Sequence, residues 1–500
     1  MTFHPIRWIA LLTALMALTA CADTLAAPNA QPTERAMQPI EQPSAQPQPT
    51  TYNACQVAED APTTRHTVVA DINYVEKAIL VSQRTHYINR TGQPLDQILF
   101  NVEPNRWANT FILAQITRAG ILLSNSLDDK RLTVDLPEPL QPGCEVDLNM
   151  VFRLQVPQVG VGVNVRKGFF GYTFTQMNLG HWLPTVAPIQ GDAWVSRQAF
   201  LIGEQEVLDK ADWAVTINLT GEITDLMLAA PGEETVLAVD RYRYVLNNAR
   251  DFSLSISDQF EMLPTVADDG TRIEIYTVSQ QMNSAATVEA LDAATTSVAM
   301  FADLFGAYPY ERLVIIEGDF PDGMEFSGMV FVGRNWFTNY PGTPASYLVL
   351  ITVHEVAHQW WYASVGNDPA LNPWLDEALS TYSEYIFIEE YYPDLRDWWW
   401  SFRVDSFSPQ GWVDAQVYEF DNARSYINAV YLRGVRMLHA LRTDIGTDAF
   451  FQLLADYAAA GQDKIATPEL FWSLLTPEQL ALTAETRARY LRQPELRLGG

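Results

Sequence analysis

The sequence has few basic residues. Its 500 residues include only five Lys, and Lys+Arg total 32 against 60 Asp+Glu, which gives a formal net charge of −28. Nucleic acids are bound through clusters of Lys and Arg, so this balance argues against a nucleic-acid partner. Hydrophobic residues make up 48% of the chain, a composition typical of globular domains and not of disordered chains. At roughly 150 residues per domain, the length indicates two or three domains.

Long apolar runs are also missing. The run 8–20 follows Arg7 and is too short to span a bilayer, which is typical of a signal peptide. It ends in Leu18-Thr19-Ala20-Cys21, which resembles the lipobox of bacterial lipoproteins and implies a diacylated Cys21. We therefore expect residues 1–21 to be a lipoprotein signal peptide. The alternative is an ordinary signal peptide with a chance cysteine. The mature chain would be exported and lipid-anchored on the outer face of a bacterial cytoplasmic membrane, or held in the periplasm or cell envelope.

Cysteine is scarce, with three in the chain. With Cys21 assigned to lipid, Cys55 and Cys144 remain, and an exported chain permits a disulfide between them. The sequence leaves open whether the two meet. Residues 22–62 are rich in Pro, Gln, Ala and Ser and have few large apolar residues, which predicts a flexible linker.

The rest of the chain divides into two halves. Residues 63–265 contain many short strand-like runs separated by Gly, Pro, Asn and Asp, which predicts an N-terminal all-β domain, either a sandwich or a saddle-shaped sheet. In residues 266–500 we expect a strand at 272–278, a helix at 284–305 and a strand at 313–316, with helices dominating from about 345. The predicted fold class is therefore multidomain α+β with a mostly helical second half.

A metal-binding pattern lies in this second half. The segment His354–His358 reads His-Glu-Val-Ala-His inside an apolar run without Pro or Gly, so the two His lie on one face of a helix. Glu377 follows His358 after eighteen residues, near the start of a helix that begins after Pro373. Two His and one Glu leave the fourth position of a Zn²⁺ ion open to water, and Glu355 can reach that water as a general base. The pattern predicts a catalytic site with one zinc ion.

This arrangement resembles the gluzincin aminopeptidases of the aminopeptidase N and leukotriene hydrolase type. Phe305–Tyr310 also resembles the segment that leads into the active-site sheet of that family. The resemblance implies a β-rich domain followed by a thermolysin-like zinc metallopeptidase domain. It further implies peptide substrates with a free N-terminus.

Two further motifs carry implied roles. Asp322-Gly323-Met324-Glu325-Phe326 stands where the family has Gly-x-Met-Glu-Asn, which places Gly323 and Met324 in substrate binding and implies that Glu325 binds the substrate α-amine. Tyr431-Leu432-Arg433-Gly434 resembles the Tyr-x-Lys-Gly of the family and implies that Tyr431 donates a hydrogen bond to the developing oxyanion. Tyr426 is expected to line the same cleft.

The chain departs from the family in several places. Thr175–Asn178 resembles a loop that often carries a second amine-binding carboxylate, but here Gln176 and Asn178 are the candidate substrate-binding residues. Phe326 replaces the family Asn. Glu384 lies seven residues after Glu377, where it holds a metal ligand or the substrate amine, or is an ordinary surface carboxylate. The large helical C-terminal domain of the family is also expected to be missing, because the chain ends about 70 residues after Tyr431.

The sequence therefore predicts a zinc aminopeptidase. One alternative is a zinc endopeptidase or a non-peptide hydrolase with an open cleft, because the amine subsite has one carboxylate fewer. A more distant alternative is a catalytically silent surface lipoprotein that binds peptides. The membrane is expected to be a partner only through the lipid anchor, and the sequence does not indicate an oligomeric state.

Overall fold

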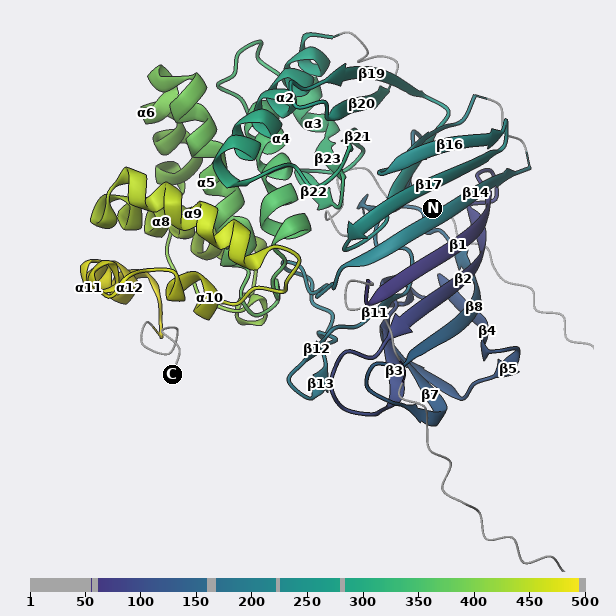
Figure 1. The fold of residues 1–500 in the computed structure, drawn as a ribbon. Helices are drawn as coiled ribbons and strands as arrows, with labels where there is room; N and C mark the ends of the chain where they lie inside the picture. The colour runs from purple at the N-terminus through teal and green to yellow at the C-terminus, as the bar shows by residue number, and fades with distance from the viewer. Residues whose placement is uncertain (1–54, 56–61, 160–167, 222–224, 279–283, 494–500) are drawn as a thin grey trace, which may run out of the picture. The chain divides into compact units, whose positions relative to one another are not determined.

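The computed structural model describes Cys55 and residues 62–159, 168–221, 225–278 and 284–493 (Figure 1). The predicted signal peptide with Cys21 and nearly all of the predicted linker lie outside these residues. No helix in the described part of the chain is long and apolar enough to cross a membrane. The predicted α+β fold class is confirmed, because a strand-rich part precedes a part dominated by helices.

An eight-stranded sheet forms the main body of the first part. Its strands are β1 (Thr64–Asn73), β2 (Ala78–Ile88), β4 (Phe111–Arg118), β5 (Ile121–Leu122), β8 (Glu145–Gln155), β14 (Ala211–Thr220), β16 (Glu233–Ala238) and β17 (Arg241–Ala249). They are ordered β16-β17-β14-β1-β2-β8-β4-β5, and only β1 and β14 pair in parallel. Buried and less buried residues alternate along β8, since neighbouring side chains of a strand point to opposite faces. One face of the sheet therefore carries the core.

Smaller sheets complete the first part. One has the order β11-β3-β7-β6, a second the order β15-β18-β10-β9, and β12 pairs with β13. The bounds are β3 (Leu95–Asn101), β6 (Asn125–Asp128), β7 (Arg131–Leu140), β9 (Phe170–Tyr172), β10 (Met177–Leu179), β11 (Thr185–Val186), β12 (Ile189–Gln190), β13 (Ala193–Trp194), β15 (Met227–Ala229) and β18 (Leu254–Ser257). The β9–β10 hairpin lies on the side of the first part that meets strand β21 (Arg312–Gly318) of the second part, because the Gln176 side-chain amide donates to the Glu317 carbonyl.

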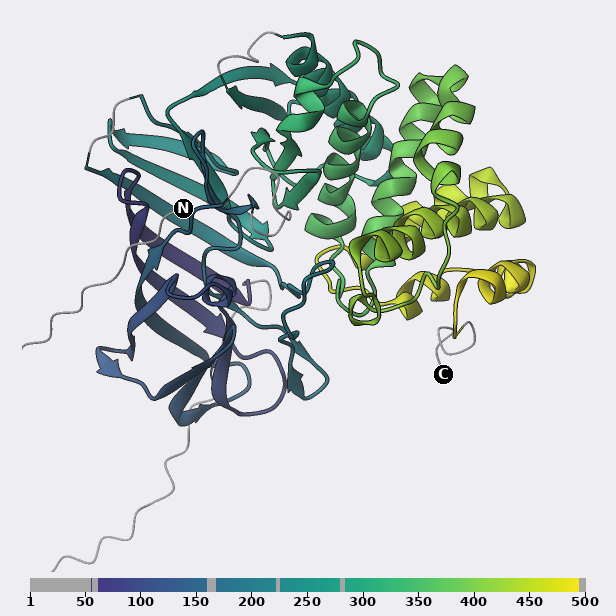
Figure 2. The same cartoon turned by 180° about the vertical axis from the view of Figure 1, so that it is seen from behind.

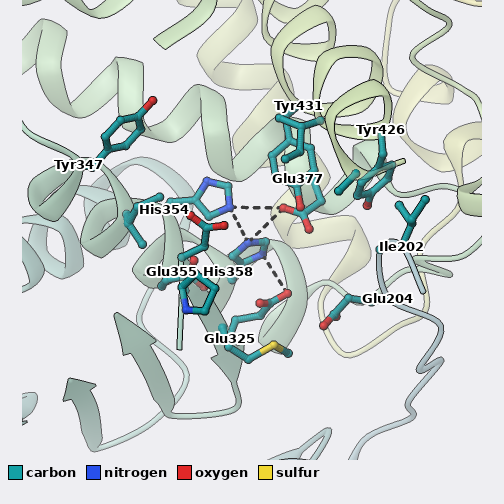
Figure 3. Close-up of a pocket in the computed structure, with 18 of the residues that line it drawn as sticks. Ile202, Glu204, Glu325, Tyr347, His354, Glu355, His358, Glu377, Tyr426 and Tyr431 are labelled. Carbon is teal, nitrogen blue, oxygen red and sulfur yellow. Dashed lines mark hydrogen bonds and ion pairs between the residues drawn. The ribbon is translucent and has the colours of Figure 1, made fainter. Parts of the chain in front are cut away.

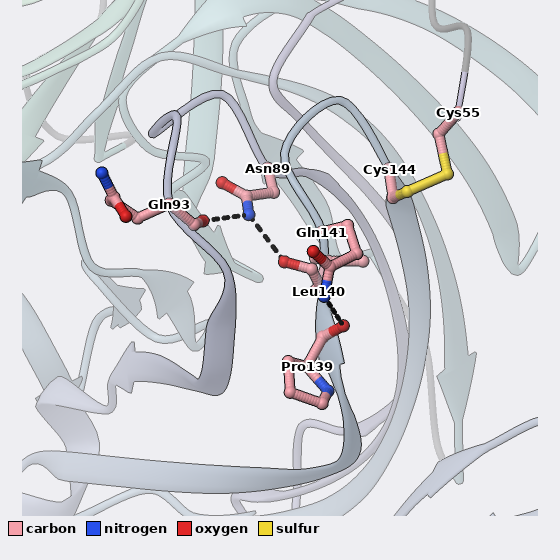
Figure 4. The surroundings of a disulfide bond; sticks show 7 residues. All are labelled: Cys55, Asn89, Gln93, Pro139, Leu140, Gln141 and Cys144. Atoms are coloured by element: carbon pink, nitrogen blue, oxygen red, sulfur yellow. Dashed lines mark hydrogen bonds between the residues drawn. A yellow bond between two sulfur atoms is a disulfide. The ribbon is translucent and has the colours of Figure 1, made fainter. Parts of the chain in front are cut away.

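Cys55 and Cys144 form a disulfide at the edge of this first part (Figure 4). Their Cα atoms are 4.9 Å apart, within the range that a disulfide requires. The turn before Cys144 is fixed by Asn89, whose side-chain amide donates to the carbonyls of Gln93 and Leu140, each at 2.7 Å. The disulfide therefore ties the start of the described chain to a well-anchored turn.

A five-stranded sheet opens the second part. Its strands are β19 (Phe260–Val266), β20 (Arg272–Val278), β21 (Arg312–Gly318), β22 (Gly323–Phe326) and β23 (Met329–Gly333), in the order β19-β20-β21-β23-β22. The sheet begins at Phe260, a few residues before the predicted domain start at 266. Helix α2 (Ala285–Phe305) follows β20, with the Ser284 hydroxyl accepting from the Thr287 amide at 3.2 Å and Gly306 ending it.

Two buried helices carry the predicted metal ligands. Helix α4 (Tyr347–His358) packs against β22, β23 and helix α5 (Trp374–Tyr391), as Figures 1 and 2 show. A π-helical turn (Gln359–Ser364) continues α4, and α5 begins directly after Pro373. Helices α6 and α8 pack on α5, and the helices that follow α5 in the chain are α6 (Arg396–Trp399), α7 (Ala423–Tyr426), α8 (Arg433–Ile445), α9 (Thr447–Gly461), α10 (Pro468–Ser473), α11 (Pro477–Leu482) and α12 (Ala484–Tyr490).

Candidate active site

The side chains of His354, His358 and Glu377 converge on one point (Figure 3). Their ligand atoms all lie within 4.8 Å of one another. The two Nε2 atoms are 3.1 Å apart, and the Oε2 atom of Glu377 lies 3.3 Å from one and 3.6 Å from the other. Spacing of four residues on α4 brings the two rings together, and packing of α5 on α4 brings in the carboxylate. Two imidazoles and one carboxylate are a typical ligand set for a catalytic zinc ion.

Both imidazole rings are oriented by carboxylates. Nδ1 of His354 donates to Glu384 at 3.0 Å, and Nδ1 of His358 donates to Asp376 at 2.5 Å. These bonds put the proton on Nδ1 and leave the lone pair of each Nε2 facing the point of convergence. Metal-binding His residues are held by this arrangement in many proteins. Arg403 in turn donates two hydrogen bonds of 2.8 Å to Glu384. The carboxylate that orients His354 is therefore itself held in place.

Glu355 lies beside the ligands, at the wall of a cavity of about 500 Å³. Its Oε2 atom is buried and has no hydrogen-bond partner among the described residues. Burial raises the pKa of Glu355 to about 8. A divalent cation next to this carboxyl would favour its charged form. The ligand set and the unbonded buried carboxylate oxygen therefore both fit a zinc ion with an open position.

Gly323 allows this close approach. A Cβ atom at position 323 would overlap with the carboxylate of Glu355. Strand β22 therefore passes directly beside the general-base candidate, and its next residues, Met324 and Glu325, line the same cavity. Asp322, just before the strand, adopts a left-handed backbone conformation with φ 64°.

Tyr431 and Tyr426 lie on the opposite side of the ligands (Figure 3). The ring of Tyr431 is nearly parallel to that of His354, with centroids 6.0 Å apart, and it meets the ring of Tyr426 edge-on at 5.5 Å. Burial raises the pKa of both phenols well above their ordinary value, and the Glu377 carboxylate raises them further. Both hydroxyl groups therefore stay protonated and can donate hydrogen bonds.

Glu325 projects into the cavity from β22. Burial raises its pKa well above the ordinary value, and the carboxylates of Glu204, Asp376, Glu355 and Glu377 raise it further. The next residue, Phe326, points away into the core. It packs edge-on against Phe169 at 5.9 Å and against His181 at 5.0 Å.

Three candidate substrate-binding residues lie behind the cavity wall. Gln176 donates to the Glu317 carbonyl at 2.9 Å and accepts from the Asp319 amide at 2.7 Å. The amide of Asn178 donates to the Gly168 carbonyl and to Gln176, and its oxygen accepts from Ser255. Glu384 is buried behind His354, where it orients the ring. None of the three is among the described residues that line the cavity. Of the possibilities left open for Glu384, the structure places it beside His354, a candidate metal ligand, and not at the surface.

Sequence reasoning missed Asp376 and Glu204 as members of the site, and it did not predict that Arg403 pairs with Glu384. Asp376 directly precedes Glu377, so its position in the first turn of α5 was an available signal. Arg403 and Glu204 lie far along the chain from the metal-binding pattern and occur in no motif. Only the fold brings them to the cavity wall.

Comparisons with known proteins agree with this site. The model of the peptidase family M1 domain matches residues 289–486, a range that contains His354, His358, Glu377 and Tyr431. Aminopeptidase M1-A of Oryza sativa subsp. japonica is 25% identical over 235 residues, which are 44% of this chain and 26% of that protein. Endoplasmic reticulum aminopeptidase 1 of Homo sapiens is 28% identical over 233 residues, which are 43% of this chain and 24% of that protein. The chain spans about a quarter of the length of these relatives.

The fold also has counterparts among solved structures. The M1 zinc metallopeptidase from Deinococcus radiodurans superimposes with a TM-score of 0.64 at 17% identity, over 86% of this chain and 94% of that one. The match includes the strand-rich part as well as the helical part, because it covers most of both chains. Residues 289–486 are thus similar to a peptidase family M1 domain, and the described chain shares the fold of the M1 zinc metallopeptidase from Deinococcus radiodurans.

Proposed function

We propose that this chain is a zinc-dependent metallopeptidase that removes residues from the N-terminus of peptides. The observation that carries the proposal is the convergence of His354, His358 and Glu377 beside the unbonded carboxylate oxygen of Glu355. Relatives named as aminopeptidases support it. A mutant of the M1 zinc metallopeptidase from Deinococcus radiodurans, 16% identical with a TM-score of 0.61, was solved with a Tyr-Ser-Ala substrate. Peptides are therefore the substrate class that we propose here.

The chemistry is divided among a few side chains. When bound by His354, His358 and Glu377, a zinc ion supplies Lewis-acid polarisation of a water molecule and of the substrate carbonyl. Glu355 takes the proton of the attacking water and passes it to the nitrogen of the leaving amine. Tyr431 donates a hydrogen bond to the carbonyl oxygen as negative charge develops on it. Glu325 holds the α-ammonium group and so fixes which peptide bond lies beside Glu355.

The test uses the zinc-loaded protein without residues 1–21. One peptide is supplied with a free N-terminus and with an acetylated N-terminus, and the products are identified by mass spectrometry. Stepwise loss of residues from the free peptide alone is the expected result. Internal cleavage of both peptides would contradict aminopeptidase action and favour an endopeptidase. Binding of the peptides without any cleavage at full zinc occupancy would contradict the proposed enzyme as a whole.

The role of Glu355 is tested by Glu355→Gln. We expect turnover to fall by about 10²–10⁴-fold, because a general base contributes on this scale. The zinc content should be unchanged, since Glu355 is not one of the three ligands. Glu390→Gln is the matched control. Glu390 is exposed on α5, so this substitution removes the same charge away from the site. An active, zinc-loaded Glu355→Gln protein would rule out this assignment.

We also propose that the chain is exported and lipid-anchored through Cys21. The support is the sequence Leu18-Thr19-Ala20-Cys21 at the end of a short apolar run. Replacement of Cys21 by Ser should move the protein from the membrane fraction to the soluble fraction of the producing bacterium. An unchanged membrane fraction would contradict the anchor.

A further inference from the structure

The cavity has a second end, on the far side of the candidate metal ligands from Glu325. Figure 3 shows Tyr347 and Glu325 on opposite sides of His354, and both residues line the cavity. A peptide whose amino group lies at Glu325 and whose scissile bond lies beside Glu355 therefore extends its remaining residues towards Tyr347. We call this part of the cavity the leaving-group end, and its lining residues are Trp336, Tyr347, Ile351, Arg403, Phe407 and Arg424.

The two ends of the cavity differ in charge. Burial raises the pKa of Tyr347, and the guanidinium groups of Arg403 and Arg424 partly offset this rise. The same two groups act in this direction on Asp322, whose pKa is also raised by burial. At Glu325, by contrast, the charges that raise the pKa further after burial are all carboxylates. Positive side chains therefore gather at the leaving-group end and negative ones at the other.

The wall of the leaving-group end is mostly apolar. The rings of Trp336 and Tyr347 have centroids 4.7 Å apart, and Ile351 lies one turn further along α4. A wall of this kind is typical of ligand-binding cavities, in which a few polar groups fix the orientation of the ligand. The charged side chains available for this purpose are Arg403, Arg424 and Asp322.

Arg403 is already committed to the protein. Its guanidinium is buried and donates two hydrogen bonds of 2.8 Å to Glu384, which in turn accepts from His354. A substrate group that drew Arg403 away would disturb the orientation of a candidate metal ligand. Arg403 therefore supports the site and is not the group that meets the substrate.

Arg424 has no such commitment. It lies on α7, and its guanidinium stacks over the ring of Phe407 at 4.5 Å from the centroid. No carboxylate in the described part of the chain forms an ion pair with it, Asp322 included. Stacking covers one face of the planar group and leaves its edge N–H groups free to donate. A cation held in this way at an apolar wall is ready to pair with an anionic group of a ligand.

We infer that Arg424 selects substrates that carry a carboxylate on the leaving-group side of the scissile bond. The inference rests on the proposed aminopeptidase function and assigns a specificity to that same site. A carboxylate can come from the C-terminus of a dipeptide or from an Asp or Glu side chain at the second position. Both sources offer the planar pair of acceptors that a guanidinium binds through two parallel hydrogen bonds.

The test is a competition among four peptides that differ only on the leaving-group side. The zinc-loaded protein without residues 1–21 receives an equimolar mixture of Ala-Ala, Ala-Ala amide, Ala-Glu amide and Ala-Gln amide. Mass spectrometry follows the loss of the N-terminal Ala from each, and the relative rates give the ratios of kcat/KM. We expect a carboxylate peptide to be preferred over its neutral counterpart by about 5- to 20-fold, because the charge-assisted hydrogen bonds form where solvent screens them in part. Preference within the first pair assigns the C-terminal carboxylate, and preference within the second pair assigns the side chain.

The variant Arg424→Gln should abolish this preference. We expect KM of the preferred peptide to rise with kcat little changed, because the contact lies away from the reacting atoms. Arg424→Lys keeps the charge but not the planar pair of donors, so it should retain part of the preference. Arg396→Gln is the matched control, since Arg396 is exposed on α6 and does not line the cavity. Zinc content is measured for every variant and should not change.

The outcomes separate this inference from the proposed function. Removal of Ala from all four peptides at equal rates would refute the role of Arg424 and leave the aminopeptidase proposal standing. The same holds if Arg424→Gln keeps the preference, or if it slows all four peptides equally, since Arg424 would then contribute only to packing. If no peptide loses its N-terminal Ala, the proposed function is refuted and the inference with it.

Discussion

At the scale of single residues, the absence of a side chain at position 323 is a requirement of the site. We expect Gly323→Ala to lower turnover by roughly 10²-fold, because its Cβ would displace the Glu355 carboxylate and misplacement of a reacting group by about 1 Å costs this much. Zinc content should be unchanged, since Gly323 touches the base and not the ligands. Turnover and zinc content are measured on the same preparation. Thr220→Ala is the control, because Thr220 is exposed at the end of β14 and does not line the cavity. Normal turnover by Gly323→Ala would show that Glu355 does not need its present position.

A second prediction at this scale concerns the support behind the ligands. Glu384→Gln should weaken zinc binding by about 10- to 100-fold, because the bond from Nδ1 of His354 and the two bonds from Arg403 lose their charged acceptor. The measurement is a zinc competition with a chelator, and Glu390→Gln on the same helix is the control. Turnover at saturating zinc should be largely restored. If turnover stays low in fully loaded Glu384→Gln, then Glu384 acts on the substrate and not through His354.

Some residues of the site could be predicted from the sequence and others could not. The spacing of four residues places His354 and His358 on one face of a single helix. Glu377 follows near the start of the next helix, so these residues could be predicted from the pattern. Glu325 and Tyr431 needed the family resemblance, because their own neighbourhoods contain no metal-binding pattern. Glu204 and Arg403 depend on long-range packing. No local rule connects a loop after β13 with a strand that lies over a hundred residues later.

At the scale of elements, a buried arginine holds the end of the helix that carries the ligands. Arg250 directly follows β17, and its guanidinium donates to the carbonyls of Tyr362 and Ser364, at 2.6 and 2.9 Å, in the π-helical turn after α4. It also donates to the carbonyls of Leu208 and Lys464, at 2.8 and 2.9 Å. These bonds satisfy backbone groups that the end of a helix leaves open.

We expect Arg250→Met to lower the free energy of unfolding by roughly 3 kcal/mol or more, because several buried carbonyls lose their donor at once. Urea denaturation measures the change. Arg241→Met is the matched control, since Arg241 is exposed on β17 and should shift the midpoint little. Equal stability of the two variants would mean that water replaces the guanidinium in this pocket.

Element positions were predicted better than element ends. The strand expected at 272–278 and the helix expected at 284–305 match β20 and α2 closely, because Ser284 caps the helix and Gly306 stops it. The apolar run after Tyr347 gives no sign that α4 changes to a π-helical turn at Gln359. The carbonyls of Tyr362 and Ser364 in this turn accept hydrogen bonds from Arg250, a partner that lies outside the run.

At the scale of the whole molecule, one covalent bond restrains the described chain. The Cys55–Cys144 disulfide joins positions 89 residues apart. We expect Cys144→Ser to lower the free energy of unfolding by roughly 2–5 kcal/mol, mainly because the unfolded chain gains freedom. Thermal or urea unfolding under oxidising conditions measures this. The double variant with Cys55→Ser should be no less stable than the single one, since both remove the same bond. An unchanged stability of Cys144→Ser would contradict a formed disulfide.

The order of the two halves was apparent in the sequence, whereas the connections between them were not. Alternating strands followed by amphipathic helices are local patterns, and they predicted a β-rich part before a helical part. The disulfide remained open because two cysteines carry no distance information. The bonds that join the halves, such as Gln176 to Glu317 and Arg197 to Asp368, link positions more than a hundred residues apart.

The buried arginine has a consequence for exchanging the halves between relatives. Arg250 belongs by sequence to the strand-rich half, yet Gly366 of the helical half leaves room for its guanidinium, which a Cβ there would overlap. Arg250 and Gly366 therefore depend on each other, and they lie on opposite sides of the domain boundary that the sequence predicts near residue 265. A chimera that takes its first half from another protein without this arginine would have a cavity at the end of α4. The carbonyls of Tyr362 and Ser364 would lose their donor there. The two halves are therefore not interchangeable modules, and a working graft has to carry the arginine with it.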